Sequence, residues 1–204
     1  MSQPQSPSQN QSRNQPQGRS LASPGARRAL VTGASTGIGE ATVRLLRAHG
    51  WDVVATARRA RRLEVLAAET GCAWVAADLQ RSEDVERLAA EVLAAGGVDA
   101  VVNNAGGALG ADPVADGSPQ EWLTMYERNV LAALRVTQAF LPAMRERGGD
   151  IVLLTSTAAH DTYPGGAGYV AAKHGERIIA NTLRLELVGE PVRVIEIAPG
   201  MVAT

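Results

Sequence analysis

The sequence predicts an α/β fold, namely a doubly wound parallel sheet with helices on both faces. Short apolar runs alternate with helical segments six times along the chain, which is the pattern of a parallel sheet. Glycine-rich and polar motifs directly follow the predicted strands, and ligands bind such sheets at the carboxyl ends of their strands. Right-handed crossovers then give the strand order 3-2-1-4-5-6.

The composition restricts the classes of partner. Lys and Arg number 20 and Asp and Glu 21 among 204 residues, so no polyanion such as a nucleic acid is implied. Cys72 is the single cysteine, which excludes an internal disulfide bond. The sequence has no apolar run long enough for a bilayer and no signal-peptide pattern. We therefore expect a cytoplasmic protein that binds neither nucleic acid nor membrane.

The first 25 residues are mostly Gln, Ser, Pro and Asn. Such a segment buries too little apolar surface to offset the entropy of ordering, and we predict a disordered tail over 1–25. Residues 26–204, about 180 in number, suit one domain.

The first strand–helix unit contains a glycine turn. The apolar run 29–31 is followed by Gly33-x-x-x-Gly37-x-Gly39 and by a helical pattern over 40–49. Glycines in such a turn let the backbone approach a pyrophosphate, and the amino end of the helix attracts its charge. We expect a phosphate-binding loop here; the alternative is a tight strand–helix turn without a ligand.

The second strand, predicted over 52–57, ends before Arg58 and Arg59. In a dinucleotide-binding fold this strand end meets the adenosine ribose, where an acidic residue would bind the 2′-hydroxyl of NAD. Cations favour a 2′-phosphate, and therefore NADP. We assign the phosphate to Arg58, because Arg59, Arg61 and Arg62 also fit a solvated start of the next helix.

The middle of the chain continues the alternation. A helix is predicted over 63–69, a strand over 72–77, and a helix over 82–94 that Ser82 would cap. The next strand, over 98–102, is a nearly continuous apolar run, as expected of a central parallel strand.

A long helix is predicted over 119–147. Ser118 followed by Pro119 forms a typical helix start. Asn129 falls in its middle, where asparagine is a poor helix former. Pro142 is expected to kink or divide its last part.

Two side chains near the end of the chain suggest proton transfer. After a strand over 151–155, a helix over 169–187 begins with Tyr169 and Lys173, and a strand over 192–197 follows. Four residues apart on a helix, the two side chains share one face. An ammonium group near a phenol lowers its pKa from the usual value of about 10, which makes a proton donor and acceptor.

The motifs of the chain, in order, are Thr32-Gly33-x-x-x-Gly37-x-Gly39, Asp78, Asn103-Asn104-Ala105-Gly106, Asn129, Ser156, Tyr169-x-x-x-Lys173 and Pro199-Gly200. Together these motifs resemble the short-chain dehydrogenases/reductases over residues 28–204. The resemblance implies a Rossmann fold, a nicotinamide cofactor, and an oxidoreductase that interconverts an alcohol and its carbonyl by hydride transfer. It also implies a homodimer or homotetramer.

The resemblance assigns roles to four catalytic residues. Tyr169 would be the general acid and base, and Lys173 would lower its pKa and hold the nicotinamide ribose. Ser156, thirteen residues before Tyr169, would hydrogen-bond the substrate oxygen. Asn129 would hold a water molecule in a proton relay behind Lys173.

The resemblance also implies a set of NADP-binding residues. Asp78 would contact the adenine, Asn103 and Gly106 would line the cofactor, and Thr204 would contact its nicotinamide end. The full set is Gly33, Ser35, Thr36, Gly37, Ile38, Gly39, Arg58, Arg59, Asp78, Leu79, Asn103, Ala105, Gly106, Tyr169, Lys173, Pro199, Gly200, Val202 and Thr204.

A narrower resemblance concerns the substrate. The run 103–110, with Trp122, Met125 and Arg58-Arg59, is similar to NADP-dependent 3-hydroxy acid dehydrogenases of the serine and allo-threonine type. It implies a 3-hydroxy acid as a candidate substrate, although other NADP-dependent members reduce different carbonyls. We expect Trp122 and Met125 to serve helix packing rather than substrate contact.

The sequence departs from the family pattern at its end. A substrate-covering segment and a seventh strand would follow Pro199-Gly200, and both are missing. We expect a truncated sequence, and the alternative function is a cofactor-binding module or inactive fragment without turnover.

Two other kinds of site are not favoured. Ser156, His160 and Asp161 are too close in sequence for a hydrolytic triad and lack a nucleophile elbow. His49 and His174 have no partners at metal-ligand spacing, and no metal site is predicted.

Overall fold

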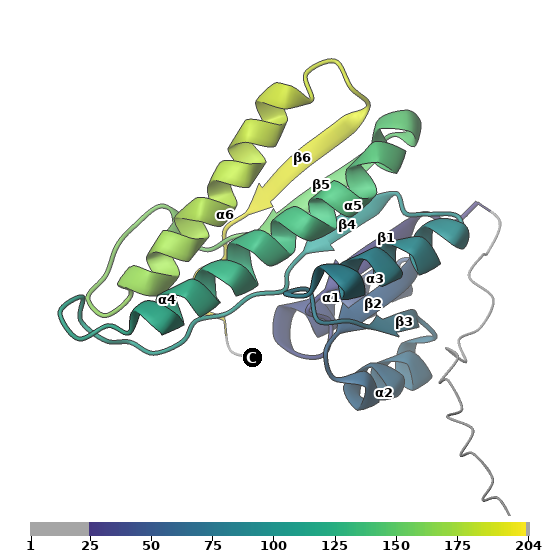
Figure 1. The fold of residues 1–204 in the computed structure, drawn as a ribbon. Helices are drawn as coiled ribbons and strands as arrows, with labels where there is room; N and C mark the ends of the chain where they lie inside the picture. The colour runs from purple at the N-terminus through teal and green to yellow at the C-terminus, as the bar shows by residue number, and fades with distance from the viewer. Residues whose placement is uncertain (1–24, 203–204) are drawn as a thin grey trace, which may run out of the picture.

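The computed structural model describes residues 25–202 and contains the predicted parallel sheet (Figure 1). Its six strands follow the order β3-β2-β1-β4-β5-β6, which confirms the predicted fold class and strand order. The predicted tail, apart from Gly25, and the predicted cofactor residue Thr204 lie outside the described residues. Within the described part of the chain, no helix combines the length and the apolarity needed to cross a membrane.

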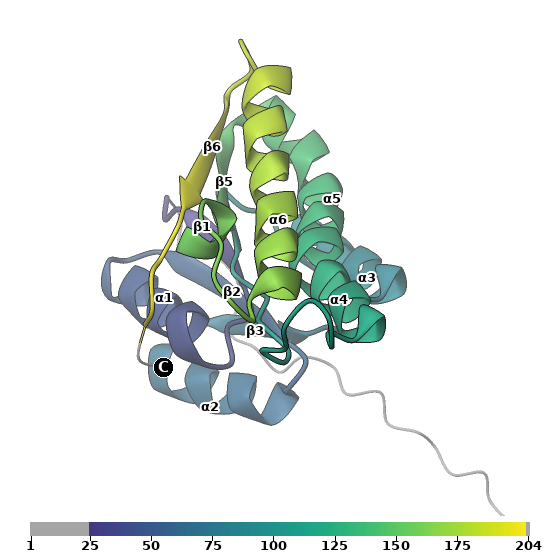
Figure 2. The same cartoon turned by 90° about the vertical axis from the view of Figure 1, so that its left-hand side faces the viewer.

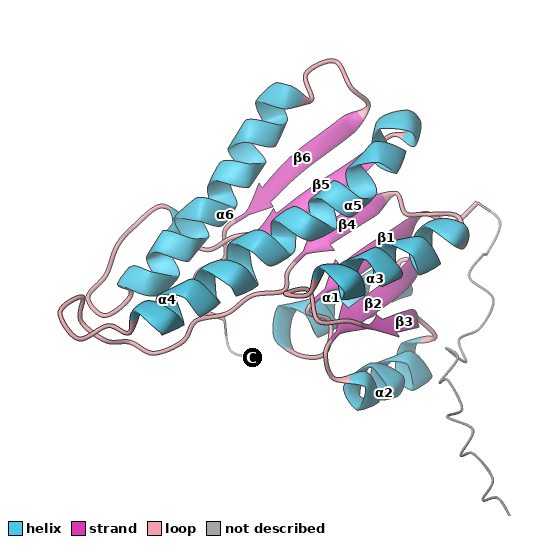
Figure 3. Cartoon of the chain, viewed as in Figure 1, coloured by secondary structure: helices cyan, strands magenta, loops and turns pink. Residues whose placement is uncertain are grey.

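Strands and helices alternate through most of the chain (Figure 3). The strands are β1 (Arg28–Thr32), β2 (Asp52–Ala57), β3 (Ala73–Ala76), β4 (Ala100–Asn103), β5 (Gly149–Leu154) and β6 (Val192–Ile197). The α-helices are α1 (Gly37–Ala48), α2 (Ala60–Thr70), α3 (Ser82–Ala94), α4 (Pro119–Tyr126), α5 (Ala132–Arg147) and α6 (Ala167–Glu186). Two short helical segments are η1 (Glu127–Leu131), a π-helix, and η2 (Thr157–Ala159), a 3₁₀-helix.

The core forms two layers, one on each face of the sheet (Figure 2). Successive strand residues point to opposite faces, so Leu30 and Val31 in β1 belong to different clusters. Leu30 packs with residues of α3, α5 and α6, including the fully buried Phe140. Val31 packs with Val43 of α1 and Leu63 of α2. Burial on both faces explains why the middle of β1, residues 29–31, is an uninterrupted apolar run.

The helix predicted over 119–147 is interrupted, but at a different residue from the one expected. Pro142 lies inside α5 without ending it, so the predicted division there is wrong. Phe140 and Met144, both buried on either side of Pro142, anchor this part of the helix to the core. The interruption is instead the π-helical segment η1, which contains Asn129. A π-helix inserts an extra residue into a turn and often marks a functional site.

The start of α3 also differs from the prediction. Arg81 is the N-cap residue, and Ser82 is the first helical residue, so the predicted Ser82 cap is wrong. The Asp84 side chain accepts the Asp78 N–H at 2.8 Å instead. This bond fixes the chain directly after β3, where Asp78 faces the carboxyl edge of the sheet.

Candidate active site at the carboxyl edge of the sheet

The four predicted catalytic residues come from three neighbouring elements. Ser156 follows β5, Tyr169 and Lys173 lie in α6, and Asn129 lies in η1. Gly106, after β4, connects them: a Cβ atom there would lie 2.4 Å from Asn129 Oδ1 and 3.5 Å from Lys173 Nζ. Only glycine leaves room for this approach, so the fold brings these residues together at one end of the sheet.

Asn129 joins the loop after β4 to the helical layer. Its Oδ1 accepts the Gly107 N–H at 2.9 Å, and its Nδ2 donates to Gly107 O at 3.0 Å and to Met125 O at 2.7 Å. The residue is 0% exposed. Both amide donors are thus occupied by backbone, and the side chain holds the site together.

Asn104 belongs to the motif over 103–106, but no role for it was predicted. Its Nδ2 donates to Thr32 O at 2.8 Å, and so it joins the ends of β1 and β4. A Cβ atom added to Gly33 would lie 2.8 Å from Asn104 Nδ2, and one added to Gly39 would lie 2.4 Å from the same nitrogen. Two of the loop glycines are therefore explained by packing against Asn104. In the sequence, the pattern that indicates this role is the pair of asparagines directly after the apolar run 98–102.

Asn103 points to the helical layer instead. Its Nδ2 donates to Thr137 Oγ1 at 3.2 Å, while its Oδ1 is buried without a hydrogen-bond partner among the described residues. This arrangement gives the two asparagines separate functions in positioning the loop after β4.

Tyr169 and Ser156 lie within hydrogen-bonding distance of each other. The Ser156 hydroxyl accepts the Ala158 N–H at 3.1 Å, which fixes its side chain at the start of η2. Burial raises the pKa of Tyr169, a hydrogen bond with Ser156 lowers it in part, and the charge of Glu176 raises it further. The pKa of Tyr169 is therefore raised, not lowered as the sequence predicts, because burial is the largest effect.

Lys173 lies near Tyr169 but has closer polar partners of its own. Its ammonium lies 5.9 Å from the centre of the Tyr169 ring, but it donates to Glu176 Oε2 at 2.6 Å and to Leu154 O at 3.0 Å. Lys173 is 4% exposed and Glu176 is 1% exposed. Burial raises the pKa of Glu176 to about 7, although the charge and hydrogen bond of Lys173 lower it. The role of Glu176 was not predicted from the sequence. The pattern that indicates it is an acidic residue three positions after Lys173, on the buried face of the same helix.

A groove runs along the carboxyl ends of β1 to β4. Of the residues predicted to bind the cofactor, nine line it: Gly33, Ser35, Thr36, Arg58, Arg59, Asp78, Leu79, Ala105 and Gly106. Gln80 and Arg128 also line it, and neither was predicted.

The two arginines after β2 differ in their contacts. Both are exposed and line the groove. Arg59 also donates to Ser35 Oγ at 2.9 Å and to Thr36 Oγ1 at 3.3 Å. Arg59 is thus tied to the glycine turn, which the alternative of a merely solvated helix start does not account for.

The amino end of α1 faces the same groove. Its N-cap residue, Thr36, makes no side-chain hydrogen bond to the first turn. Gly33 and Gly37 have φ of 64° and 57°, which favours glycine. The backbone N–H groups of this turn are therefore presented to the groove without a side-chain cap.

The chain after β6 lies against the same site. Thr157 N–H donates to Pro199 O at 2.9 Å, which places this segment beside Ser156. Gly200 and Val202 are exposed.

A separate pocket lies beside Tyr169. Trp122 and Met125 of α4 line it, and both would also be within 3.0 Å of a Cβ atom on Gly168. The expected packing of these residues on α6 is present, and they border the pocket as well. Among the described residues that line it are the acidic Asp112 and Glu121 and no Lys, Arg or His.

Comparison with known proteins gives a consistent result. A family profile described as short chain dehydrogenase matches residues 27–204. An uncharacterized oxidoreductase of Mycobacterium tuberculosis is 52% identical over 177 residues, which cover 86% of this chain and 69% of the relative. An NADP-dependent 3-hydroxy acid dehydrogenase of Salmonella typhi is 40% identical, with 85% and 71% covered. A solved structure, described as a closed serine dehydrogenase complexed with NADP+, has a TM-score of 0.83 at 37% identity, with 86% and 73% covered.

Proposed function

Because the chain belongs to the short chain dehydrogenase family and is thus an oxidoreductase, we propose that it uses NADP(H) to interconvert an alcohol and its carbonyl. The observation that carries the proposal is the meeting of Ser156, Tyr169 and Lys173, with Lys173 beside Gly106, a residue of the groove. That groove also holds a glycine turn and two arginines.

The residues of the groove fit a dinucleotide with a 2′-phosphate. The uncapped amino end of α1 would hold the pyrophosphate through backbone N–H groups. Arg58 and Arg59 stand at the end of β2, where a carboxylate would select NAD. When bound, the nicotinamide would supply or accept the hydride. Relatives described as NADP-dependent or as complexed with NADP+ support this choice.

Tyr169 would transfer the proton. In the reducing direction it donates its phenolic proton to the carbonyl oxygen, while the Ser156 hydroxyl hydrogen-bonds the same oxygen. Because burial raises the pKa of Tyr169, the phenol is protonated at neutral pH, which favours reduction. Lys173 would hold the nicotinamide ribose. A water relay at Asn129 would use its main-chain carbonyl, since both amide donors of the side chain are occupied.

Two features bear on the substrate. The names of the relatives favour a 3-hydroxy acid or its semialdehyde. The acidic Asp112 and Glu121 beside Tyr169 favour a neutral or cationic group in that pocket. Turnover with 3-hydroxy acids, compared with neutral alcohols of the same size, distinguishes these substrate classes. NADPH binding without turnover of any of them would instead support a cofactor-binding module.

Self-association is part of the proposal. Exposed apolar side chains gather on the two helices that pack against each other beside the site: Leu123 and Tyr126 on α4, and Ile178 and Leu185 on α6. A sedimentation measurement is expected to give a homodimer or homotetramer.

Replacing either arginine is expected to change the choice of cofactor. Arg58→Ala and Arg59→Ala should each weaken NADPH binding about 10- to 100-fold and leave NADH binding nearly unchanged, because a charge-assisted bond to the 2′-phosphate is lost. Titration of the chain with each cofactor, followed by nicotinamide fluorescence, measures both affinities.

Arg145→Ala is the matched control, because Arg145 pairs with Glu190 on the surface and does not line the groove. Equal losses of NADPH and NADH affinity would remove the argument for NADP.

A further inference from the structure

Glu176, the partner of Lys173, has no role in the reaction described above. We propose that Glu176 is a buried counter-ion and positioning residue that neutralises the Lys173 ammonium and thereby sets the pH range in which Tyr169 exchanges its proton. The inference rests on the proposed function for its consequence in turnover, but not for its effect on Tyr169 itself.

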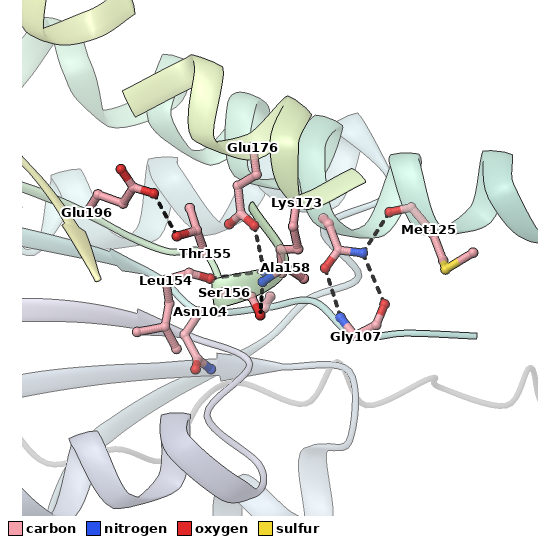
Figure 4. Close-up of polar contacts among 12 residues, drawn as sticks. Asn104, Gly107, Met125, Leu154, Thr155, Ser156, Ala158, Lys173, Glu176 and Glu196 are labelled. Carbon is pink, nitrogen blue, oxygen red and sulfur yellow. Dashed lines mark hydrogen bonds and ion pairs between the residues drawn. The ribbon is translucent and has the colours of Figure 1, made fainter. Parts of the chain in front are cut away.

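The geometry of the pair supports this role (Figure 4). Glu176 Oε2 lies 2.6 Å from Lys173 Nζ, and the Leu154 carbonyl lies 3.0 Å from the same nitrogen. Two of the three ammonium donors are thus used, and both direct the side chain into the space between α6 and the end of β5. Glu176 therefore holds Lys173 in place as well as balancing its charge.

The charges of the pair act on Tyr169 in opposite directions. An ammonium 5.9 Å from the phenol ring stabilises the phenolate. The Glu176 carboxylate, 2.6 Å from that ammonium, opposes the effect, and its charge is one of the causes that raise the pKa of Tyr169. An ionised pair therefore carries no net charge, and its two effects on Tyr169 oppose each other.

Glu176 is placed to change its own charge. Its Oε1 is buried without a hydrogen-bond partner among the described residues. A proton can therefore bind to Oε1 while Oε2 still accepts the hydrogen bond from Lys173. Burial raises the pKa of Glu176 to about 7. Below that pH Glu176 is neutral and the Lys173 charge acts on Tyr169; above it the two charges cancel.

Other charged groups surround the pair. Glu196 on β6 raises the pKa of Glu176 further. Glu196 itself accepts the Thr155 hydroxyl at 2.9 Å and lies 3.3 Å from His160 Nε2. Asp, Glu, His and Arg residues of the elements packed against α6, and of α6 itself beside the pair, are Glu121 on α4, Glu127 and Arg128 on η1, Asp150 on β5, His160 after η2, Arg193 and Glu196 on β6, and His174, Arg177 and Arg184 on α6. Glu127 pairs with Arg135, and both Arg177 and Arg184 lie 3.9 Å from Glu196.

The test is a titration of the Tyr169 phenol in the chain without cofactor. Ultraviolet absorbance of phenolate is measured against pH, and the signal of a Tyr169→Phe variant is subtracted. Glu176→Gln keeps the size of the side chain and an acceptor for Lys173, but it removes the negative charge. Its Tyr169 midpoint is expected to fall by about one pH unit. Glu186→Gln, at an exposed position of the same helix, is expected to leave the midpoint unchanged.

A second variant protects the test against a failure of folding. Lys173→Met with Glu176→Leu replaces the buried pair by apolar residues of similar volume, a change that proteins often tolerate. Because the charges cancel in the ionised pair, its Tyr169 midpoint is expected to match that of the unmodified chain. An unchanged midpoint in Glu176→Gln, or a clearly raised one in the double variant, overturns the proposal.

Turnover separates this inference from the proposed function. The pH profile of kcat/KM for carbonyl reduction should move in Glu176→Gln in the same direction as the phenol titration. A shifted titration without turnover by the unmodified chain contradicts the proposed function and leaves the role of Glu176 intact. Normal turnover with an unshifted titration and pH profile contradicts the role of Glu176 alone.

Discussion

Replacing Tyr169 by Phe is expected to reduce turnover by at least about 100-fold, which is the usual contribution of a general acid. The hydroxyl is the group that would donate the proton, and Ser156 beside it has no charge to take over that task. NADPH binding is expected to remain within about two-fold, because the ring that packs against α4 is retained. The loss of NADPH absorbance with a carbonyl substrate measures turnover, and fluorescence titration measures binding.

Tyr126→Phe is the control for this substitution, because Tyr126 is exposed on α4 and lies outside the pocket beside Tyr169. It removes the same atom and is expected to keep turnover unchanged. Full activity of Tyr169→Phe would exclude Tyr169 as the proton donor.

Asn129→Ala is expected to lower the free energy of unfolding by about 3 kcal/mol, since it removes three hydrogen bonds to partly or fully buried backbone groups, at about 1 kcal/mol or more each. Those groups are the N–H and carbonyl of Gly107 and the carbonyl of Met125. Urea unfolding, monitored by circular dichroism, measures the change. Turnover should be lost as well, because the loop after β4 would no longer be fixed against Lys173.

The matched control is Asn181→Ala on α6, where the side chain accepts a hydrogen bond from the exposed Arg184. Its expected effect is within about 0.5 kcal/mol, as for most surface substitutions. If Asn129→Ala were as mild as Asn181→Ala, the three hydrogen bonds of Asn129 would not hold the site.

The arrangement of the sheet followed from patterns that are local in sequence. Apolar strands such as β1, and turn glycines such as Gly33, leave a direct trace in the chain, and right-handed crossovers restrict the strand order. The convergence of Ser156, Tyr169 and Lys173 at one sheet edge could be predicted for the same reason, since each follows from its position after a strand or along one helix.

Contacts between distant segments could not be predicted in this way. The packing of Asn104 against Gly33 depends on the separation of β1 and β4 in space. The π-helical turn at Asn129 arises where its side chain bonds the Gly107 backbone. The pKa of Tyr169 was predicted with the wrong sign, because the spacing of Tyr169 and Lys173 reveals neither the burial of the phenol, which is the largest effect, nor the buried carboxylate of Glu176.

The hydroxyl of Thr32 has a consequence for the kinetics of ligand binding. Its Oγ1 donates to Val102 O at 3.2 Å and accepts the N–H groups of Asn104 and Ala105, each at 2.9 Å. One atom thus fixes the backbone of Asn104 and Ala105, and Ala105 lines the groove. Association should then be limited by diffusion and orientation rather than by loop rearrangement, and little conformational entropy is lost on binding. In a Thr32→Val chain the backbone of Asn104 and Ala105 would have to become ordered during binding, and the association rate should therefore fall.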